Sequence, residues 1–254
     1  MRPRGRVAGP IDLVYPSNVP RALLSHDTPA SHSDSSQTRG AGTSLVLVAL
    51  ALCFFGSGAS SLIYQVLWLR TLGWVFGVTT YAASTVWATF MTGLAVGSLL
   101  AGRIADRVRH PLRWFAGCEI CIGLTAATSP SLLQLLQRGY AAAYPHLPHA
   151  LPALTAARGA MAFAALIVPT ALMGATLPLV VKGSGFQGSQ LGRRIGLLYG
   201  SNTAGAIIGT LVAGLYLIPF RGIHGAFVAA AAMNVAVGTD RKSTRLNSSH
   251  IPLS

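Results

Sequence analysis

One acidic side chain in this sequence could do chemistry because it lies inside an apolar segment. Glu119 is the chain's only glutamate, and it falls within the run Trp114–Leu136. A carboxylate in the hydrocarbon of a bilayer is costly and usually faces a bundle interior or a cavity. There it could bind a cationic substrate or take up and release a proton. The alternative is a structural pair with Arg113 near the start of the run, and the sequence leaves both open.

Other polar side chains in apolar runs could join such a site. Tyr64 and Gln65 lie near the end of the first run, and Trp68 follows one turn later. Residues four apart share a helix face, so we expect Tyr64 and Trp68 together. They could line a substrate path, but the aromatic belt at the membrane surface is the commoner role for Trp68. Asn202 opens another run, where an interhelical hydrogen bond is expected. Glu119, Tyr64, Gln65 and Asn202 are the candidate substrate or proton site.

A charged segment follows the second apolar run. It reads Gly102-Arg-Ile-Ala-Asp106-Arg107-Val-Arg109. A single acid among several arginines predicts a specific pair near the end of a neighbouring helix. The alternative is an ordinary basic loop on the cytosolic side.

The cysteines do not predict a metal site. Cys53, Cys118 and Cys121 all lie in apolar runs, and the last two form a C-x-x-C spacing. A zinc site needs two further ligands, and no matching pair is present. We expect small buried hydrophobic side chains here.

These residues must be positioned by membrane helices. Only 10% of the 254 residues are charged, against roughly a quarter in soluble domains. Crossing the hydrocarbon takes about 20 helical residues; five apolar runs reach that length and a sixth falls short. The six runs are Ser44–Leu67, Thr79–Ala101, Trp114–Leu136, Gly159–Val181, Ile195–Pro219 and Gly222–Val237. The pattern predicts an all-α integral membrane protein, a six-span helical bundle.

The basic residues predict orientation in a lipid bilayer. The net charge is +13, but the basic side chains sit in gaps between apolar runs without interleaved aromatics. We therefore expect no nucleic-acid partner. Loops on one side carry seven Lys or Arg against four on the other. By the positive-inside rule this places the N-terminus in the cytosol.

A repeated glycine pattern relates the two halves of the bundle. The pattern G-x-x-x-G-x-x-x-x-G occurs at Gly93–Gly102 and again at Gly205–Gly214, an offset of 205 − 93 = 112 residues. The same offset relates the first run to the fourth and the third to the sixth. Three spans per repeat require the second copy to be inverted, as in each half of a major-facilitator fold. The alternative is chance likeness between glycine-rich membrane helices.

The two ends of the chain have different compositions. Residues 1–43 are rich in Pro, Ser, Arg and His, which predicts a disordered tail or a start codon placed too early. Residues 240–254 include Asp240-Arg-Lys-Ser-Thr-Arg-Leu-Asn-Ser-Ser-His250, which reads as the translation of a common sequencing-adapter oligonucleotide. The membrane domain is therefore expected at 44–239, with its last span truncated.

Four segments together resemble one family. They are Ser61–Arg70, Ala95–Arg107, Pro169–Pro178 and Leu191–Gly205. They are similar to the membrane portion of bacterial fused major-facilitator/spermidine-synthase-like proteins. Gly102–Arg109 is also similar to the major-facilitator loop motif, whose Asp and Arg stabilise the bundle during conformational change. The resemblance gives those roles to Asp106 and Arg107, although the motif's later glycine is absent.

The resemblance implies a bacterial inner-membrane protein. In the family a cytosolic domain transfers an aminopropyl group from decarboxylated S-adenosylmethionine to putrescine. This chain lacks that domain's Gly-rich loop, so no catalytic residue is named, no cofactor is expected in this fragment, and it is predicted to be inactive as an enzyme. The membrane domain would anchor the missing C-terminal domain and perhaps transport polyamine. The alternatives are half of a facilitator-type transporter without enzyme activity, and a purely structural anchor.

Overall fold

A computed structural model describes residues 34–76, 79–146, 151–184 and 190–240. Over these residues it contains helices and short connections but no strand, so the expected all-helical class is confirmed there. The helices are α1 (Asp34–Phe76), α2 (Thr79–Ala105), α3 (Pro111–Ala143), α4 (Leu151–Gly183), α5 (Leu191–Val212) and α6 (Ile218–Thr239), with a short 3₁₀ turn at Tyr144–His146 and a π-helical turn at Ala213–Leu217.

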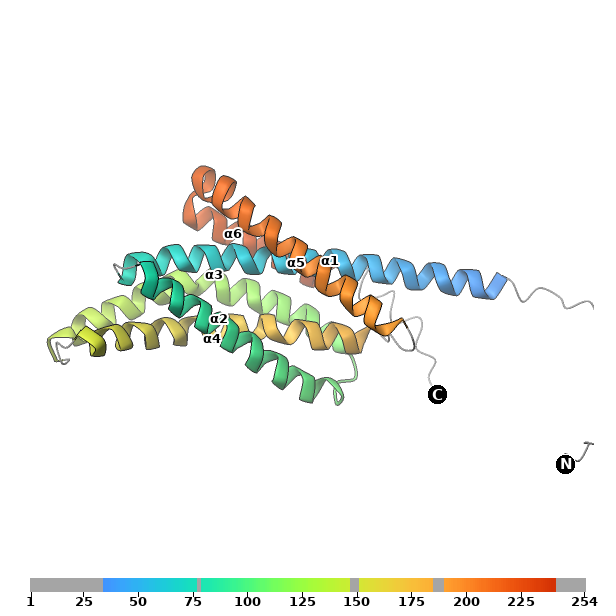
Figure 1. Cartoon of the computed structure of the whole chain (residues 1–254), viewed down its shortest axis with the longest axis horizontal. Coiled ribbons are helices and arrows are strands. Elements are labelled where there is room, and N and C mark those ends of the chain that lie inside the picture. Colours follow the sequence, from blue (N-terminus) through green and yellow to red (C-terminus); the bar gives the residue numbers. More distant parts are fainter. Residues whose placement is uncertain (1–33, 77–78, 147–150, 185–189, 241–254) are drawn as a thin grey trace, which may run out of the picture. The chain divides into compact units, whose positions relative to one another are not determined.

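The ends of the chain differ in part from expectation. The helix α1 begins at Asp34, whereas the apolar run begins at Ser44. The remaining expectations for the terminal segments concern residues 1–33 and 241–254, which lie outside the described residues. The bundle belongs to the compact unit Gly40–Ser254 (Figure 1).

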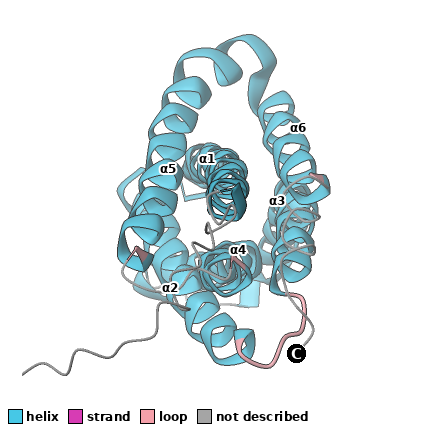
Figure 2. Ribbon diagram, turned by 90° about the vertical axis from the view of Figure 1, so that its right-hand side faces the viewer, coloured by secondary structure: helices cyan, strands magenta, loops and turns pink. Residues whose placement is uncertain are grey.

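Five helical stretches are long and apolar enough to cross a membrane. The fifth, Leu191–Thr239, has 49 residues, which as one straight helix would be about 73 Å long against about 30 Å of hydrocarbon. Its helical geometry is interrupted at Gly222, where φ is 67°, a left-handed value that glycine adopts without strain. Figure 2 shows the chain folding back between α5 and α6, which form the two sides of an arch.

The helices α2 and α4 run parallel and meet through glycines. Gly93 and Gly97 of α2 lie against the backbone of Thr170 and Ala171, and Gly174 of α4 lies against Leu94. A Cβ at any of the three glycines would overlap backbone atoms of the other helix. The two helices therefore approach each other as closely as the glycine pattern allows.

A second parallel pair, α1 and α5, uses the same device. Gly205 and Gly209 of α5 lie against the backbone of Phe55 and Ala59 in α1. Next to them, the Ser201 hydroxyl donates to the Ala51 carbonyl at 2.6 Å. Glycines of the repeated pattern in α2 and α5 thus serve the same purpose in two separate contacts.

The helices α3 and α6 run antiparallel. A Cβ placed on Gly123 would lie 3.2 Å from the Ala231 carbonyl oxygen and 3.3 Å from the Cβ of Asn234. At the other end of the contact, a Cβ placed on Gly238 would lie 2.8 Å from the Ala116 carbonyl oxygen and 2.8 Å from the Ile120 side chain. This seam brings the side chains of α6 within reach of Glu119.

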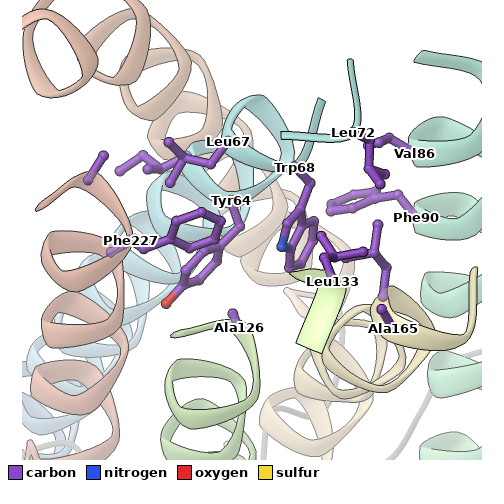
Figure 3. Packing of buried hydrophobic residues seen from close by; sticks show 14 of the residues in the cluster. Tyr64, Leu67, Trp68, Leu72, Val86, Phe90, Ala126, Leu133, Ala165 and Phe227 are labelled. Carbon is purple, nitrogen blue, oxygen red and sulfur yellow. The ribbon is translucent and has the colours of Figure 1, made fainter. Parts of the chain in front are cut away.

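The main apolar core surrounds Tyr64 and Trp68, which stack with ring centroids 5.7 Å apart (Figure 3). Trp68 is fully buried, and its indole nitrogen donates to the Ser129 hydroxyl at 2.7 Å. Trp68 thus faces the interior of the bundle, and not lipid as a side chain of an aromatic belt would.

The glycine contacts predict that substituting a glycine at a helix contact lowers stability, whereas substituting an exposed glycine does not. Gly97→Ala and Gly209→Ala should each lower the stability of the purified protein by about 1–3 kcal/mol, because the new Cβ forces two backbones apart. The matched control is Gly196→Ala in α5, where a Cβ would meet nothing within 4 Å. It should leave the melting temperature unchanged or raise it. Equal melting temperatures for all three variants in detergent would contradict the assignment.

Candidate functional site

Glu119 lies in the interior of the bundle and is fully buried. The Ser57 hydroxyl of α1 donates to its Oε1 at 2.6 Å, and the Asn234 amide of α6 donates to its Oε2 at 2.7 Å. The carboxylate therefore joins three helices that are far apart in the sequence. The alternative ion pair between Glu119 and Arg113 does not form. Arg113 is exposed, and the ion pair found among the described residues joins Asp106 and Lys182.

Local packing explains why these two donors reach Glu119. The antiparallel seam at Gly123 brings α6 close enough for the short Asn234 side chain to reach across. On α1, the hydroxyls of Ser60 and Ser61 donate to the Ser57 carbonyl oxygen at 2.9 and 2.8 Å. The serines thus satisfy their own hydrogen-bonding needs within α1, while the Ser57 hydroxyl is directed to Glu119.

The electrostatics of this centre are unusual for a membrane interior. Both donors are neutral groups, and among the described residues no Lys or Arg forms an ion pair with Glu119. Two hydrogen bonds reduce the cost of burying a carboxylate, but its negative charge stays uncompensated in a medium of low dielectric constant. The centre therefore favours any species that brings one positive charge.

Of the candidate residues, Tyr64 lies on α1 two turns after Ser57, the residue that donates to Glu119. The Tyr64 ring packs on Phe227 of α6 with centroids 6.1 Å apart. Gln65 is half-buried next to it, with no hydrogen bond within the described part of the chain. Asn202 lies on α5 against Gly58, at the α1–α5 contact.

Sequence reasoning missed both hydrogen-bond partners of Glu119. Asn234 carried a usable signal, because it is a lone amide in the apolar run of α6, just as Asn202 is in α5. Ser57 carried none, since serines are common in membrane helices and its neighbours Ser60 and Ser61 look the same. Only the packing of three helices distinguishes it.

The charged segment after α2 forms an ion pair with another helix. The Lys182 ammonium at the end of α4 donates to the Asp106 carboxylate at 2.6 Å, and both side chains are exposed. This hydrogen bond and the charge of Lys182 hold the pKa of Asp106 below its usual value. Gly102 and Arg107 are exposed, and a Cβ on Gly102 would meet nothing within 4 Å. The pair joins the ends of the parallel helices α2 and α4.

The three cysteines lie in three different environments. Cys53 is buried, Cys118 is half-buried and Cys121 is exposed. Across the described ranges, no three His, Cys, Asp or Glu side chains come together as metal ligands. The C-x-x-C spacing thus has no further ligands in the described part of the fold.

Comparison of the chain with protein-family models, curated proteins and solved structures finds no match. The class of protein follows from the fold alone. Its helices are long and apolar enough to cross a bilayer several times, and a carboxylate lies at the centre of the bundle. The chain is a multi-pass helical membrane protein.

The Glu119 centre predicts strong coupling between its members. Asn234→Leu should lower the free energy of unfolding by about 1–3 kcal/mol, because Glu119 loses a donor while it stays buried. Glu119→Leu alone should cost a similar amount by leaving Asn234 without an acceptor. The double variant should cost less than the sum of the two, since both polar partners are then gone.

The measurement is unfolding in mixed detergent micelles. Thr128→Val on the same helix is the control, because Thr128 is exposed and bonds only to carbonyls of its own helix. It should change stability by less than about 0.5 kcal/mol. Strictly additive losses at Glu119 and Asn234 would argue against the interaction.

Proposed function

We propose that the chain is the membrane domain of a facilitator-like transport protein, and that it binds one positive charge at Glu119 in the bundle interior. The observation that carries this proposal is the fully buried Glu119 carboxylate, held by two neutral donors from α1 and α6. Intramembrane carboxylates without a basic partner are typical of substrate and ion pathways. A purely structural role would be served equally well by an uncharged residue.

The helix contacts support an inverted arrangement of two three-helix repeats. Gly97 of α2 meets Ala171 of α4, and Gly209 of α5 meets Ala59 of α1. The 112-residue offset exchanges the two contacts, since 97 + 112 = 209 and 59 + 112 = 171. The contact between the antiparallel helices α3 and α6 joins positions that the offset itself relates, because Gly123 packs near Val235 and 123 + 112 = 235. Contacts related in this way are what an inverted repeat requires.

In this proposal the long fifth stretch is two spans, and the whole is a six-span half of a facilitator-like fold. The interruption at Gly222 near the start of α6, where the chain folds back from α5, supports it (Figure 2). The positive-inside bias of the loops favours a cytosolic N-terminus in a bacterial inner membrane. The Asp106–Lys182 pair would then lie on the cytosolic side, where the loop motif of facilitators acts.

The solute we propose is a polyamine, from the resemblance to fused synthase-like proteins. A polyamine carries primary ammonium groups, and an ammonium complements a carboxylate that has only neutral partners. Glu119 is fully enclosed in this conformation, so an organic cation reaches it only when the helices move apart. That requirement agrees with alternating access around a central site. In the family that the chain resembles, aminopropyl transfer belongs to the cytosolic domain, and its co-substrate, decarboxylated S-adenosylmethionine, would bind there.

Uptake of radiolabelled putrescine into proteoliposomes tests the proposal. Glu119→Gln keeps the size and one acceptor oxygen, replaces the other oxygen by an NH₂ donor and removes the charge. It should reduce uptake at least about tenfold, since a charge-assisted contact is worth about 1.5–3 kcal/mol. The control is Gln134→Ala, an exposed position on the same helix. Glu119→Gln with wild-type uptake would remove Glu119 from transport, and no uptake by the wild type would remove polyamine transport.

A further inference from the structure

Two buried polar atoms on the helices that surround Glu119 have no hydrogen-bond partner among the described residues. They are the amide oxygen of Asn234 and the hydroxyl of Tyr64. Both side chains are fully buried. Leaving a buried polar atom unpaired costs about 1–3 kcal/mol, so two such atoms in one bundle interior require an explanation.

The unpaired atoms belong to neighbouring layers of the same three helices. Tyr64 follows Ser57 by seven residues on α1, and Ala126 follows Glu119 by seven on the neighbouring α3. On the antiparallel α6, Phe227 precedes Asn234 by seven. Seven residues make two turns, about 10 Å, so these residues define two layers across the same three helices.

The Tyr64 side chain extends from one layer toward the other. Side chains on a helix lean toward its N-terminus, which for Tyr64 is the direction of Ser57. Figure 3 shows the Tyr64 hydroxyl pointing away from Trp68 into the space between Phe227 and Ala126. The hydroxyl is thus directed from the layer of Tyr64, Ala126 and Phe227 toward the layer that holds the Asn234 amide oxygen and the Glu119 carboxylate.

We propose that Glu119, Asn234 and Tyr64 form a binding site for sodium ion. The inference rests on the proposed function, in that it names the small cation that occupies the Glu119 centre when no organic solute is bound. All three groups present oxygen atoms, the ligands that hard cations prefer. One sodium ion compensates the single negative charge and gives both unpaired oxygens a partner.

Other occupants explain less of this arrangement. A proton on Glu119 compensates the charge but does not provide partners for both the Asn234 oxygen and the Tyr64 hydroxyl. A water molecule would pair with both oxygens but leaves the carboxylate charge uncompensated. A divalent ion would leave an excess positive charge in the membrane interior, which is costly beside one carboxylate.

Thermal unfolding of the full chain in detergent tests the site. Sodium chloride is titrated against choline chloride at constant ionic strength, and potassium chloride is run in parallel. We expect the melting temperature to rise saturably with sodium, by about 4 °C or more at saturation, and not with choline. Glu119→Gln should abolish this rise.

Two tyrosine variants make the test specific. Tyr64→Phe removes only an unpaired hydroxyl, so it should fold normally, and it should raise the sodium concentration at half-effect about tenfold or more. Tyr140→Phe is the matched control, because Tyr140 also has a buried hydroxyl without a partner but lies near the other end of α3. It should titrate like the wild type. The same midpoint for both variants would overturn the site.

The outcomes also separate this proposal from the previous one. A wild-type melting temperature that ignores sodium but follows pH, with putrescine uptake still dependent on Glu119, would overturn the sodium site and leave the proposed function standing. A sodium-dependent melting temperature that Tyr64→Phe weakens, without any putrescine uptake, would support the sodium site and remove polyamine transport.

Discussion

The interior of this bundle depends on how closely its helices can approach. In lipid there is no hydrophobic force between helices, because the solvent is as apolar as the side chains, so association relies on packing and hydrogen bonds. Glycines supply the packing here, at Gly97 against Ala171, at Gly209 against Ala59 and along the seam at Gly123. The hydrogen bond from Asn234 to Glu119 follows from this closeness, because its short side chain reaches the carboxylate where α6 lies against α3 at Gly123 and Gly238. Ser57 adds a second hydrogen bond from α1.

The two charged centres of the bundle have opposite physical character. Asp106 and Lys182 are exposed at helix ends, where water screens them and an isolated pair adds little to stability. Glu119 is enclosed and has no basic partner in the described structure, so its charge acts at full strength on whatever lies nearby. A structural role suits the first centre, since its charges balance each other. The Glu119 centre carries one negative charge without a positive partner, and this uncompensated charge is the reason to expect that it binds a cation.

Much of the fold could be predicted from the sequence, and part of the site. The apolar runs gave the helices, and Glu119 stood out because a carboxylate is rare in such runs. The environment of Trp68 could not be predicted, because whether it faces lipid or protein depends on which helices pack against α1. The partners of Glu119 were missed for a related reason. Ser57 and Asn234 become distinctive only when the crossing of α1, α3 and α6 is known, and no local pattern encodes that crossing.

The pairing of helices that are distant in sequence has a consequence for biosynthesis. The glycine-contacting face of α1 finds its partner only when α5 enters the membrane, and α2 likewise needs α4. Glu119 receives its second donor last of all, because Asn234 lies near the end of α6. A nascent chain therefore holds a half-satisfied carboxylate in lipid through most of its insertion. Membrane chaperones and quality-control proteases could recognise an incompletely assembled bundle by this exposed carboxylate.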